Sequence, residues 1–346
     1  MSQPRSAWLA HHPWLTLLVV LAVLVAAAVL AVLIGMPSLD LGTALGDPSS
    51  WQHQAFTRLQ LPRVAQGLAV GAVLGVSGAA LQGLLRNPLA DPFVLGVSGG
   101  AALGSASATL IASALGLLTA TSGAVLVEPL GGFAGALAAL FIVVALGSER
   151  GVPSPLRMLL VGVVVNALAG AALMVLAALG DPALVQRTLV RLMGTLGADP
   201  SAPLLVPVVV AAALLALLFV WPRAQALNLL ALGDETAQSL GVDPSRLRRS
   251  LFIALSLPVG AIVAVTGLIG FAGLVVPHAL RLVVGPDHRA LVPLSAALGG
   301  AFVALGDATV SALAPAMGTE LPVGVVTALI GGPVFLALLR VREVRT

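Results

Sequence analysis

The stretch WLTLLVVLAVLVAAAVLAVLI, residues 14–34, runs for 21 residues without a charged side chain. A helix of about 20 apolar residues is long enough to cross the hydrocarbon core of a bilayer. The apolar region of a cleavable signal peptide is shorter, about 7–15 residues. Arg5 precedes the stretch and no A-x-A cleavage site directly follows it. We therefore predict an uncleaved first transmembrane helix.

The rest of the chain has the same apolar composition. Hydrophobic residues make up 59% of the sequence and charged residues 9%, against about 45–50% and 25% in a soluble domain. Because no soluble domain interrupts the apolar segments, we interpret residues 1–346 as one transmembrane domain. The predicted segments are 14–34, 61–83, 93–117, 129–146, 157–179, 203–221, 251–276, 294–313 and 323–339.

The placement of arginine predicts the orientation, because cytoplasmic loops carry an excess of basic residues. With the N-terminus in the cytoplasm, 13 of the 17 basic residues fall on the cytoplasmic side, including those of the C-terminal tail. Two cytoplasmic termini require an even number of crossings, so one of the nine segments must hide a tenth. The cytoplasmic arginines are Arg5, Arg86, Arg150, Arg157, Arg223, Arg246, Arg248, Arg249, Arg281, Arg289, Arg340, Arg342 and Arg345, and the periplasmic ones are Arg58, Arg63, Arg187 and Arg191.

The hidden crossing is predicted between Arg249 and Arg281, since both flanks carry cytoplasmic arginines. Only 31 residues separate them, whereas two full spans need about 40. Gly267 and Gly270 lie near the middle, which favours one helix, a glycine turn, and a short or broken helix back. Non-helical backbone at membrane depth is tolerated only inside protein or beside a water-filled cavity. We therefore expect this region to pack inside the helical bundle.

The longest polar stretch is a predicted cytoplasmic loop at about 222–250. Asp234 is a candidate N-cap for a short helix through Leu240, which Gly241 can end. Asp243 is a candidate N-cap for the next helix, with Pro244 in its first turn. Residues 234–240 hold two acids and no base, which argues against contact with anionic lipid. The loop is interpreted as a partner-binding surface rather than a plain connector.

A G-x-S-x-G pattern and five histidines could indicate catalysis or metal binding, but a structural interpretation is favoured for both. Residues 96–100 match G-x-S-x-G, but that chemistry requires a strand-to-helix turn with a histidine and an acid. Here the pattern begins an apolar helix, and residues 75–78 form a similar small-residue cluster. Both favour close helix contact, and an intramembrane serine hydrolase stays a remote alternative. The five histidines form no metal-binding spacing, so no metal site is predicted.

An ion-coupled secondary transporter is the second function considered. Such carriers need carboxylates at mid-membrane or ion sites at broken helices. Glu128, Asp307 and Glu320 all fall near predicted periplasmic ends of helices. Asn166 is the clearest buried polar candidate, and it can either hydrogen-bond between helices or line a path. The sequence also holds no lysine and therefore no Walker A motif, so another polypeptide must bind any ATP that drives this protein.

Four blocks of sequence resemble the FecCD family, the permease subunits of type II ABC importers for iron-siderophores, haem and cobalamin. They appear in the family order and cover nearly the whole chain. The blocks run through Leu61-Pro62-Arg63 and Gly71 to Arg86-Asn87-Pro88-Leu89-Ala90-Asp91-Pro92 and Leu95-Gly96-Val97-Ser98; Leu232-Gly233, Ala237 and Leu240-Gly241-Val242; Gly267 to Leu274 with Pro277-His278, Arg281 and Gly285 to Arg289; and Glu320 to Val325 with Gly331, Pro333 and Phe335.

The resemblance implies a BtuC-like bundle of ten helices in an inner membrane, with no catalysis by this chain. It implies a homodimer with a translocation path at the dimer interface, two cytoplasmic ATPase subunits that bind ATP and Mg²⁺, and a periplasmic binding protein. It further implies residue roles. ATPase coupling falls to Asp234, Glu235, Ala237, Leu240, Gly241 and Val242; binding-protein docking to Arg58 and Arg63; the path to Gly162, Val165 and Asn166; and the structural motif to Asn87, Pro88, Asp91, Pro92, Pro277, His278 and Arg281.

Two positions depart from the family pattern. The family often has Arg-Leu-Pro-Arg where this chain has Gln60-Leu61-Pro62-Arg63, and Arg58 is a candidate substitute. Gly99 stands where the family commonly has asparagine.

Overall fold

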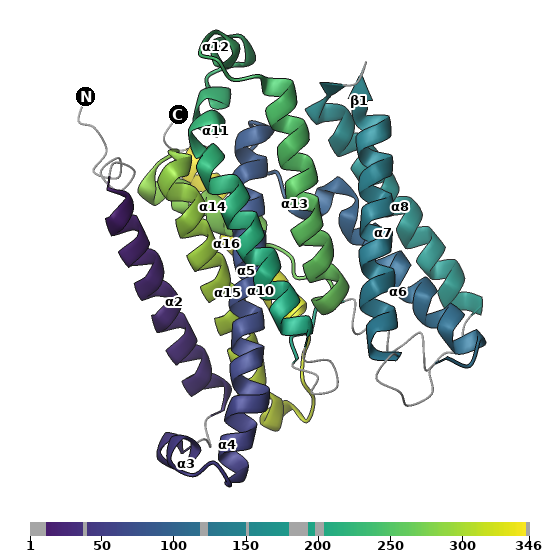
Figure 1. The fold of residues 1–346 in the computed structure, drawn as a ribbon, viewed down its shortest axis with the longest axis vertical. Helices are drawn as coiled ribbons and strands as arrows, with labels where there is room; N and C mark the ends of the chain where they lie inside the picture. The colour runs from purple at the N-terminus through teal and green to yellow at the C-terminus, as the bar shows by residue number, and fades with distance from the viewer. Residues whose placement is uncertain are drawn as a thin grey trace.

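The computed structural model describes residues 12–36, 40–117, 124–149, 152–179, 193–197 and 204–343. Figure 1 shows the long helices running roughly side by side. A short hairpin of β1 (Ser148–Glu149) and β2 (Val152–Pro153) follows α7. Of the arginines used to assign sidedness, Arg5, Arg150, Arg187, Arg191 and Arg345 lie outside the described residues. The helices are α2 (Pro13–Gly35), α3 (Leu41–Gly46), α4 (Trp51–Ala55), η1 (Phe56–Gln60), α5 (Leu61–Leu84), η2 (Pro92–Leu95), α6 (Val97–Ala114), α7 (Ala124–Gly147), α8 (Pro155–Leu179), α10 (Leu205–Val220), η3 (Trp221–Arg223), α11 (Ala224–Ala231), α12 (Asp234–Ser239), α13 (Pro244–Thr266), α14 (Ala272–Val284), α15 (His288–Met317) and α16 (Val323–Glu343).

The predicted fold class, an all-α membrane protein, is confirmed. In the described part of the chain, eight helices are long and apolar enough to cross a bilayer, and two shorter apolar helices, Ala272–Val284 and Val323–Leu338, accompany them. The count of ten crossings and the cytoplasmic position of both termini stay predictions.

Two of the predicted segments differ from the structure for a clear local reason. The second segment begins at Trp51 rather than at residue 61, because the π-helix η1 joins α4 to α5 in one helical stretch of 34 residues. Pro62 closely follows the π-helical residues of η1, and the helical stretch continues through it. The third segment is divided at Gly96, whose φ of 80° separates η2 from α6.

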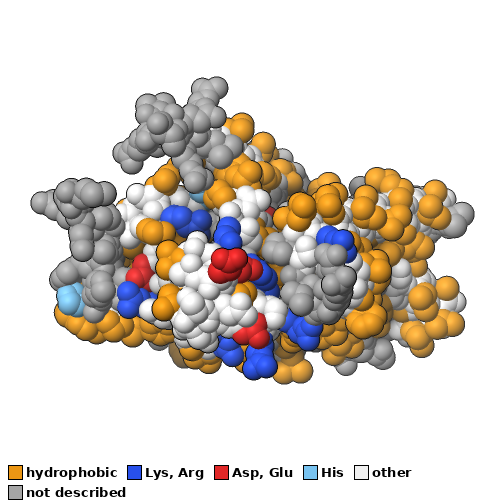
Figure 2. Space-filling view, turned by 90° about the horizontal axis from the view of Figure 1, so that it is seen from above, with side chains coloured by type: hydrophobic (Ala, Val, Ile, Leu, Met, Phe, Trp, Pro, Cys, Tyr) orange, Lys and Arg blue, Asp and Glu red, His pale blue; other side chains and the backbone are white. Residues whose placement is uncertain are grey.

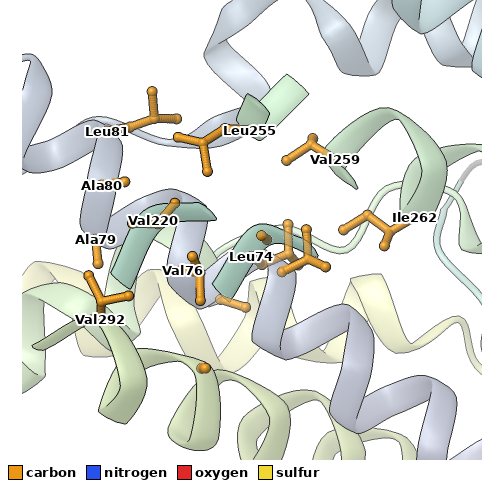
Figure 3. Packing of buried hydrophobic residues seen from close by; sticks show 14 of the residues in the cluster. Leu74, Val76, Ala79, Ala80, Leu81, Val220, Leu255, Val259, Ile262 and Val292 are labelled. Carbon is orange, nitrogen blue, oxygen red and sulfur yellow. The ribbon is translucent and has the colours of Figure 1, made fainter. Parts of the chain in front are cut away.

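The core forms around α5, which packs along α15 through small residues. A Cβ atom on Gly71 would collide with the backbone of Gly299, and one on Gly75 would collide with the carbonyl of Ser295. Without a hydrophobic driving force in lipid, such close backbone approach is what brings helices together. Figure 3 shows the apolar packing beside this contact, where side chains of α5 meet α10, α13 and α15.

The small-residue clusters singled out in the sequence are both sites of close helix contact, as predicted. A Cβ atom on Gly78 would meet the carbonyl of Gly273 in α14, and one on Gly100 would meet the carbonyl of Gly135 in α7. The two clusters thus pack against different partners. Through the second, α6 joins α7 and α8 in a group of three helices, seen at the right of Figure 1.

The predicted glycine turn divides α13 from α14. Gly267 has a φ of 73° and Phe271 is left-handed at 68°. The backbone here is paired with other segments, because Thr195 donates its N–H to the Thr266 carbonyl at 2.8 Å. Ile269 is 1% exposed, so the non-helical segment is packed inside the bundle, as expected.

After this break α14 returns to the end of the molecule where α13 began. Asn228 of α11 donates to Asp287 at 2.8 Å, and Asp287 lies directly between α14 and α15. We call this end, which carries α11 and α12, the α12 end; the end with α3 and α4 is the α3 end (Figure 1).

Candidate functional site

The short helix α12 forms the tip of the α12 end (Figure 1). The sequence placed Asp234 at its N-cap, and that assignment was wrong. Gly233 occupies the cap with a φ of 124°, and Asp234 is the first residue of the helix. The predicted stop at Gly241 is confirmed by its φ of 84°. Asp243 does cap α13, accepting hydrogen bonds from the N–H groups of Ser245 and Arg246.

The predicted coupling residues divide into buried and exposed members. Ala237 is fully buried, and Val242 donates its N–H to the Ala237 carbonyl at 2.9 Å, closing the turn. Leu240, at the end of α12, is 57% exposed, and Glu235, in its first turn, is also exposed. Figure 2, which views this end, shows acidic side chains at the tip with arginines around them and an apolar surface on the flanks. The tip therefore presents a small surface of mixed character, as a docking element would.

Asp234 is held within the chain by two arginines. Arg248 of α13 donates two hydrogen bonds to its carboxylate, at 2.7 and 2.8 Å, and Arg86 donates a third. The bonds from Arg248 and the charges of both arginines hold the pKa of the Asp234 carboxyl below its ordinary value, although partial burial opposes them. Arg86 also donates to the Leu230 carbonyl at 2.9 Å. This Asp234 clamp (Asp234, Arg86 and Arg248) joins α12 to α13 and to the end of α5.

The motif residues after α5 lie beneath this clamp. Asn87 accepts the N–H of Leu89 at 2.9 Å, and Asp91 accepts that of Phe93 at 2.8 Å. Pro92 packs against Gly273, where a Cβ atom would approach the proline ring to 2.8 Å. The loop thus turns the chain and supports the start of α14.

The other half of the predicted motif lies on α14, which contains Pro277. His278 is buried, and its ring meets Phe335 of α16 edge-on at 6.1 Å between centroids. Pro88, His278 and Arg281 line a pocket of about 440 Å³ shared with Gln82 and Arg86. The motif halves, almost 200 residues apart in sequence, therefore meet in one place behind the α12 tip.

The two arginines predicted to dock a binding protein have different environments at the α3 end. Arg63 is only 19% exposed and makes a bidentate pair with Asp307 of α15, at 2.7 and 3.1 Å. A second carboxylate, Glu320, lies 3.6 Å from it and is 63% exposed. Arg58 is exposed on η1, so it is the more accessible of the two cations.

The departure at Gln60 also has a physical explanation. Its side chain is 6% exposed and donates to the carbonyl of Ala31 in α2 at 3.2 Å. A residue at this position points into the α2 contact, whereas Arg58 points outward. An arginine at 60 would bury a charge where this chain has a neutral amide.

The three residues predicted to line the path lie on the side of α8 that faces α6. Gly162 is buried, and Val165 lies against Gly96. Asn166 donates to the carbonyl of Phe93 at 3.0 Å and accepts the N–H of Gly99 at 2.9 Å. Its role in this chain is the interhelical hydrogen bond, the other possibility that the sequence left open. A role in the path stays a prediction.

Ser98, the centre of the G-x-S-x-G pattern, belongs to the same contact. Its hydroxyl donates to the Phe93 carbonyl at 3.1 Å and lies 3.3 Å from the Asn166 side-chain oxygen. Neither group is a base that could activate a serine nucleophile. The geometry gives Ser98 a place in helix packing and offers nothing to the hydrolase interpretation.

Asn166 also accounts for the glycine at 99. A Cβ atom there would lie 2.6 Å from Asn166 Oδ1 and 3.0 Å from its Cα. We expect Gly99→Ala to destabilise the protein by about 1–3 kcal/mol, the usual cost of overpacking. Denaturant unfolding in detergent measures it. In a double-mutant cycle, Asn166→Ala should lower the free energy of unfolding by less in the Gly99→Ala background than in the wild type. Strictly additive losses of stability would contradict the explanation.

Comparison with known proteins gives consistent matches. The model of the FecCD transport family matches residues 15–341. The chain is 45% identical over 291 residues to the cobalamin import system permease protein BtuC of Halobacterium salinarum, covering 83% of this chain and 73% of that protein. It is 43% identical over 293 residues to the hemin transport system permease protein HmuU of Yersinia pestis, covering 83% and 84%.

A solved structure described as an inward-facing conformation of a metal-chelate type ABC transporter matches with a TM-score of 0.75. The two sequences are 29% identical, and the match covers 93% of this chain and 99% of the other. The family match spans every motif block, including the α12 tip and the pocket behind it. The chain belongs to the FecCD transport family.

Proposed function

We propose that this chain imports a metal chelate across the inner membrane by alternating access at the interface of two copies of itself. As a member of its family it is a permease subunit of an ABC importer, and ATP hydrolysis belongs to a separate subunit. Iron-siderophores, haem and cobalamin are the candidate cargoes. We further propose that two ATPase subunits hold ATP and Mg²⁺, and that a periplasmic protein delivers the cargo.

The observation that carries the proposal is the connection of α12 to the transmembrane helices. The tip exposes Leu240 and Glu235, while Asp234, the first residue of α12, is bonded to Arg248 and Arg86. An ATPase that moves the tip therefore moves α13 and the end of α5 with it. Such a movement of rigid helices can switch a packed bundle between two arrangements.

For the binding protein, Arg58 is the proposed contact at the α3 end. It is exposed, and an exposed cation can attract an acidic partner surface over about 10 Å at ordinary salt. Arg63 can contribute only if its bidentate pair with Asp307 opens.

Reconstitution in proteoliposomes tests the function. With its ATPase and binding protein, the wild-type chain should take up chelate only when ATP is supplied. Uptake driven by an ion gradient without the ATPase would instead establish the secondary transporter. Leu240→Asp should abolish ATP-driven uptake, since it places a charge in the ATPase contact. Leu45→Asp, at a leucine of α3 that is 69% exposed at the opposite end, should not. Equal ATP-driven uptake by Leu240→Asp and Leu45→Asp would contradict a role for α12 in contact with the ATPase.

A further inference from the structure

An apolar groove runs between α10 and α13 on the outer surface of the bundle. We call it the α10–α13 groove; its walls include Val208, Leu215 and Phe219 of α10 and Ser250, Leu257 and Ala261 of α13. Its volume is about 820 Å³, and its described lining is apolar apart from Ser250. Leu215 is 64% exposed. This surface is therefore open to the hydrocarbon of a bilayer.

The groove has the length of one lipid leaflet. Ser250 and Ala261 mark its ends on α13, and at 1.5 Å of rise per residue they lie about 16 Å apart along the helix. The hydrocarbon core of a bilayer is about 30 Å thick. α10 and α13 are joined through α11 and α12, so Phe219 and Ser250 mark the end of the groove nearer the α12 end.

Both walls carry an arginine at that same end. The guanidinium of Arg223 lies 3.6 Å over the ring of Phe219, and it donates a hydrogen bond to the Phe219 carbonyl at 2.7 Å. On α13, Arg246 precedes Ser250 by one turn, on the same face, and its side chain is 89% exposed. We call Arg223 and Arg246 the groove mouth.

Two neighbouring residues indicate the depth of the groove mouth in the membrane and its net charge. Trp221 donates its indole N–H to the Arg289 carbonyl, and tryptophan concentrates at the membrane–water interface. Asp243 is the acid beside the mouth, 3.8 Å from Arg246. It is also bonded to the N–H groups of Ser245 and Arg246, and an exposed pair of this length is weak. The mouth therefore keeps a positive charge at headgroup level.

An apolar channel one leaflet long with two cations at its interfacial end is complementary to one class of molecule. We propose that the α10–α13 groove binds an acyl chain of an anionic phospholipid, and that Arg223 and Arg246 hold the phosphate. Basic pockets between transmembrane helices recognise lipid headgroups in this way. The proposal rests on the membrane location alone and is independent of the cargo and of ATP.

Native mass spectrometry of the delipidated full-length chain tests the headgroup contact. Phosphatidylglycerol and phosphatidylcholine with identical acyl chains are titrated separately. A basic side chain near the surface strengthens binding of an anionic lipid about fivefold, so two should give phosphatidylglycerol a preference of about thirtyfold. Arg223→Gln with Arg246→Gln should remove this preference, and Arg58→Gln at the α3 end should keep it. Equal binding of both lipids by the wild type would overturn the proposal.

Filling the groove tests the acyl-chain contact. Ala211 lines the groove and is exposed, so Ala211→Trp should occupy the space without disturbing the core and should abolish retention of both lipids. Ala167→Trp, at an exposed position of α8, is the matched control and should retain them. Wild-type retention by Ala211→Trp would overturn the assignment. So would dissociation of a dimer into single chains in that variant, because it would make a second copy the occupant.

Discussion

Replacing Asp307 by alanine should lower the free energy of unfolding by about 3–5 kcal/mol, the cost of removing one partner from a buried ion pair. The Asp307 side chain is 8% exposed and that of Arg63 19%. Without the carboxylate, the guanidinium would lose two hydrogen bonds, and Glu320, at 3.6 Å, would be the one acidic partner left to it among the described residues. Chemical denaturation of the detergent-solubilised protein measures the change. An unchanged unfolding midpoint would show that the pair is not formed in solution.

A double replacement separates the structural role of Arg63 from docking. Arg63→Met with Asp307→Leu removes both charges and keeps the volume, and such exchanges are often neutral or stabilising. The double variant should therefore regain most of the stability lost by Asp307→Ala. If it also binds the periplasmic protein as the wild type does, Arg63 serves the fold and Arg58 is left as the docking cation. Loss of binding by the folded double variant would assign docking to Arg63.

Replacing Asp234 by asparagine should uncouple ATP hydrolysis from transport, with at least a tenfold fall in chelate taken up per ATP hydrolysed. The carboxylate accepts bonds from Arg248, which is 8% exposed, and from Arg86. A hydrogen bond to a charged group contributes about 1.5–3 kcal/mol, and the low end applies because the Asp234 side chain is 46% exposed. The fold should thus survive while α12 loosens from α13 and α5.

Glu235→Gln separates the clamp from the exposed surface of the tip, to which Glu235 belongs. It removes a neighbouring carboxylate that is exposed on the same helix, so it tests charge at the tip without touching the clamp. ATP hydrolysis and uptake are measured together in proteoliposomes for both variants. Equal stoichiometry in Asp234→Asn and the wild type would contradict a role for the clamp in coupling.

The sequence predicted the fold correctly where the length or spacing of a single segment determined the structure. Apolar length predicted most spans, and the shortage of residues between Arg249 and Arg281 predicted the break at Gly267. The α12 start was misplaced because a glycine with positive φ served as the cap, which a rule favouring polar N-caps does not anticipate. The extension of the α5 stretch back to Trp51 was missed because most of the ten preceding residues, 51–60, are polar although they are helical.

The site was harder to predict because its contacts join distant residues. Arg63 and Asp307 are 244 positions apart; the apolar helix around Asp307 indicates only that the carboxylate needs a partner. Asp234 was predicted to be a coupling residue, a role that stays a prediction, and its clamp to Arg86 depends on how three helices meet. For Asn166 the sequence left two roles open, and side-chain geometry was needed to identify its hydrogen-bond partners.

The helix α5 is fixed at both ends by charge. Arg63 ties the first turn of α5 to α15. Arg86, which follows the last turn of α5, forms an ion pair with Asp234 of α12. From Arg63 to the end of α5 at Leu84 the helix rises by 21 residues, about 32 Å at 1.5 Å per residue, and no proline interrupts that length beyond the first turn. A continuous helix of this length is stiff along its axis. A displacement at the α12 end is therefore transmitted to the α3 end. Under the proposed function, the binding protein and the ATPase would therefore act on opposite ends of the same helix.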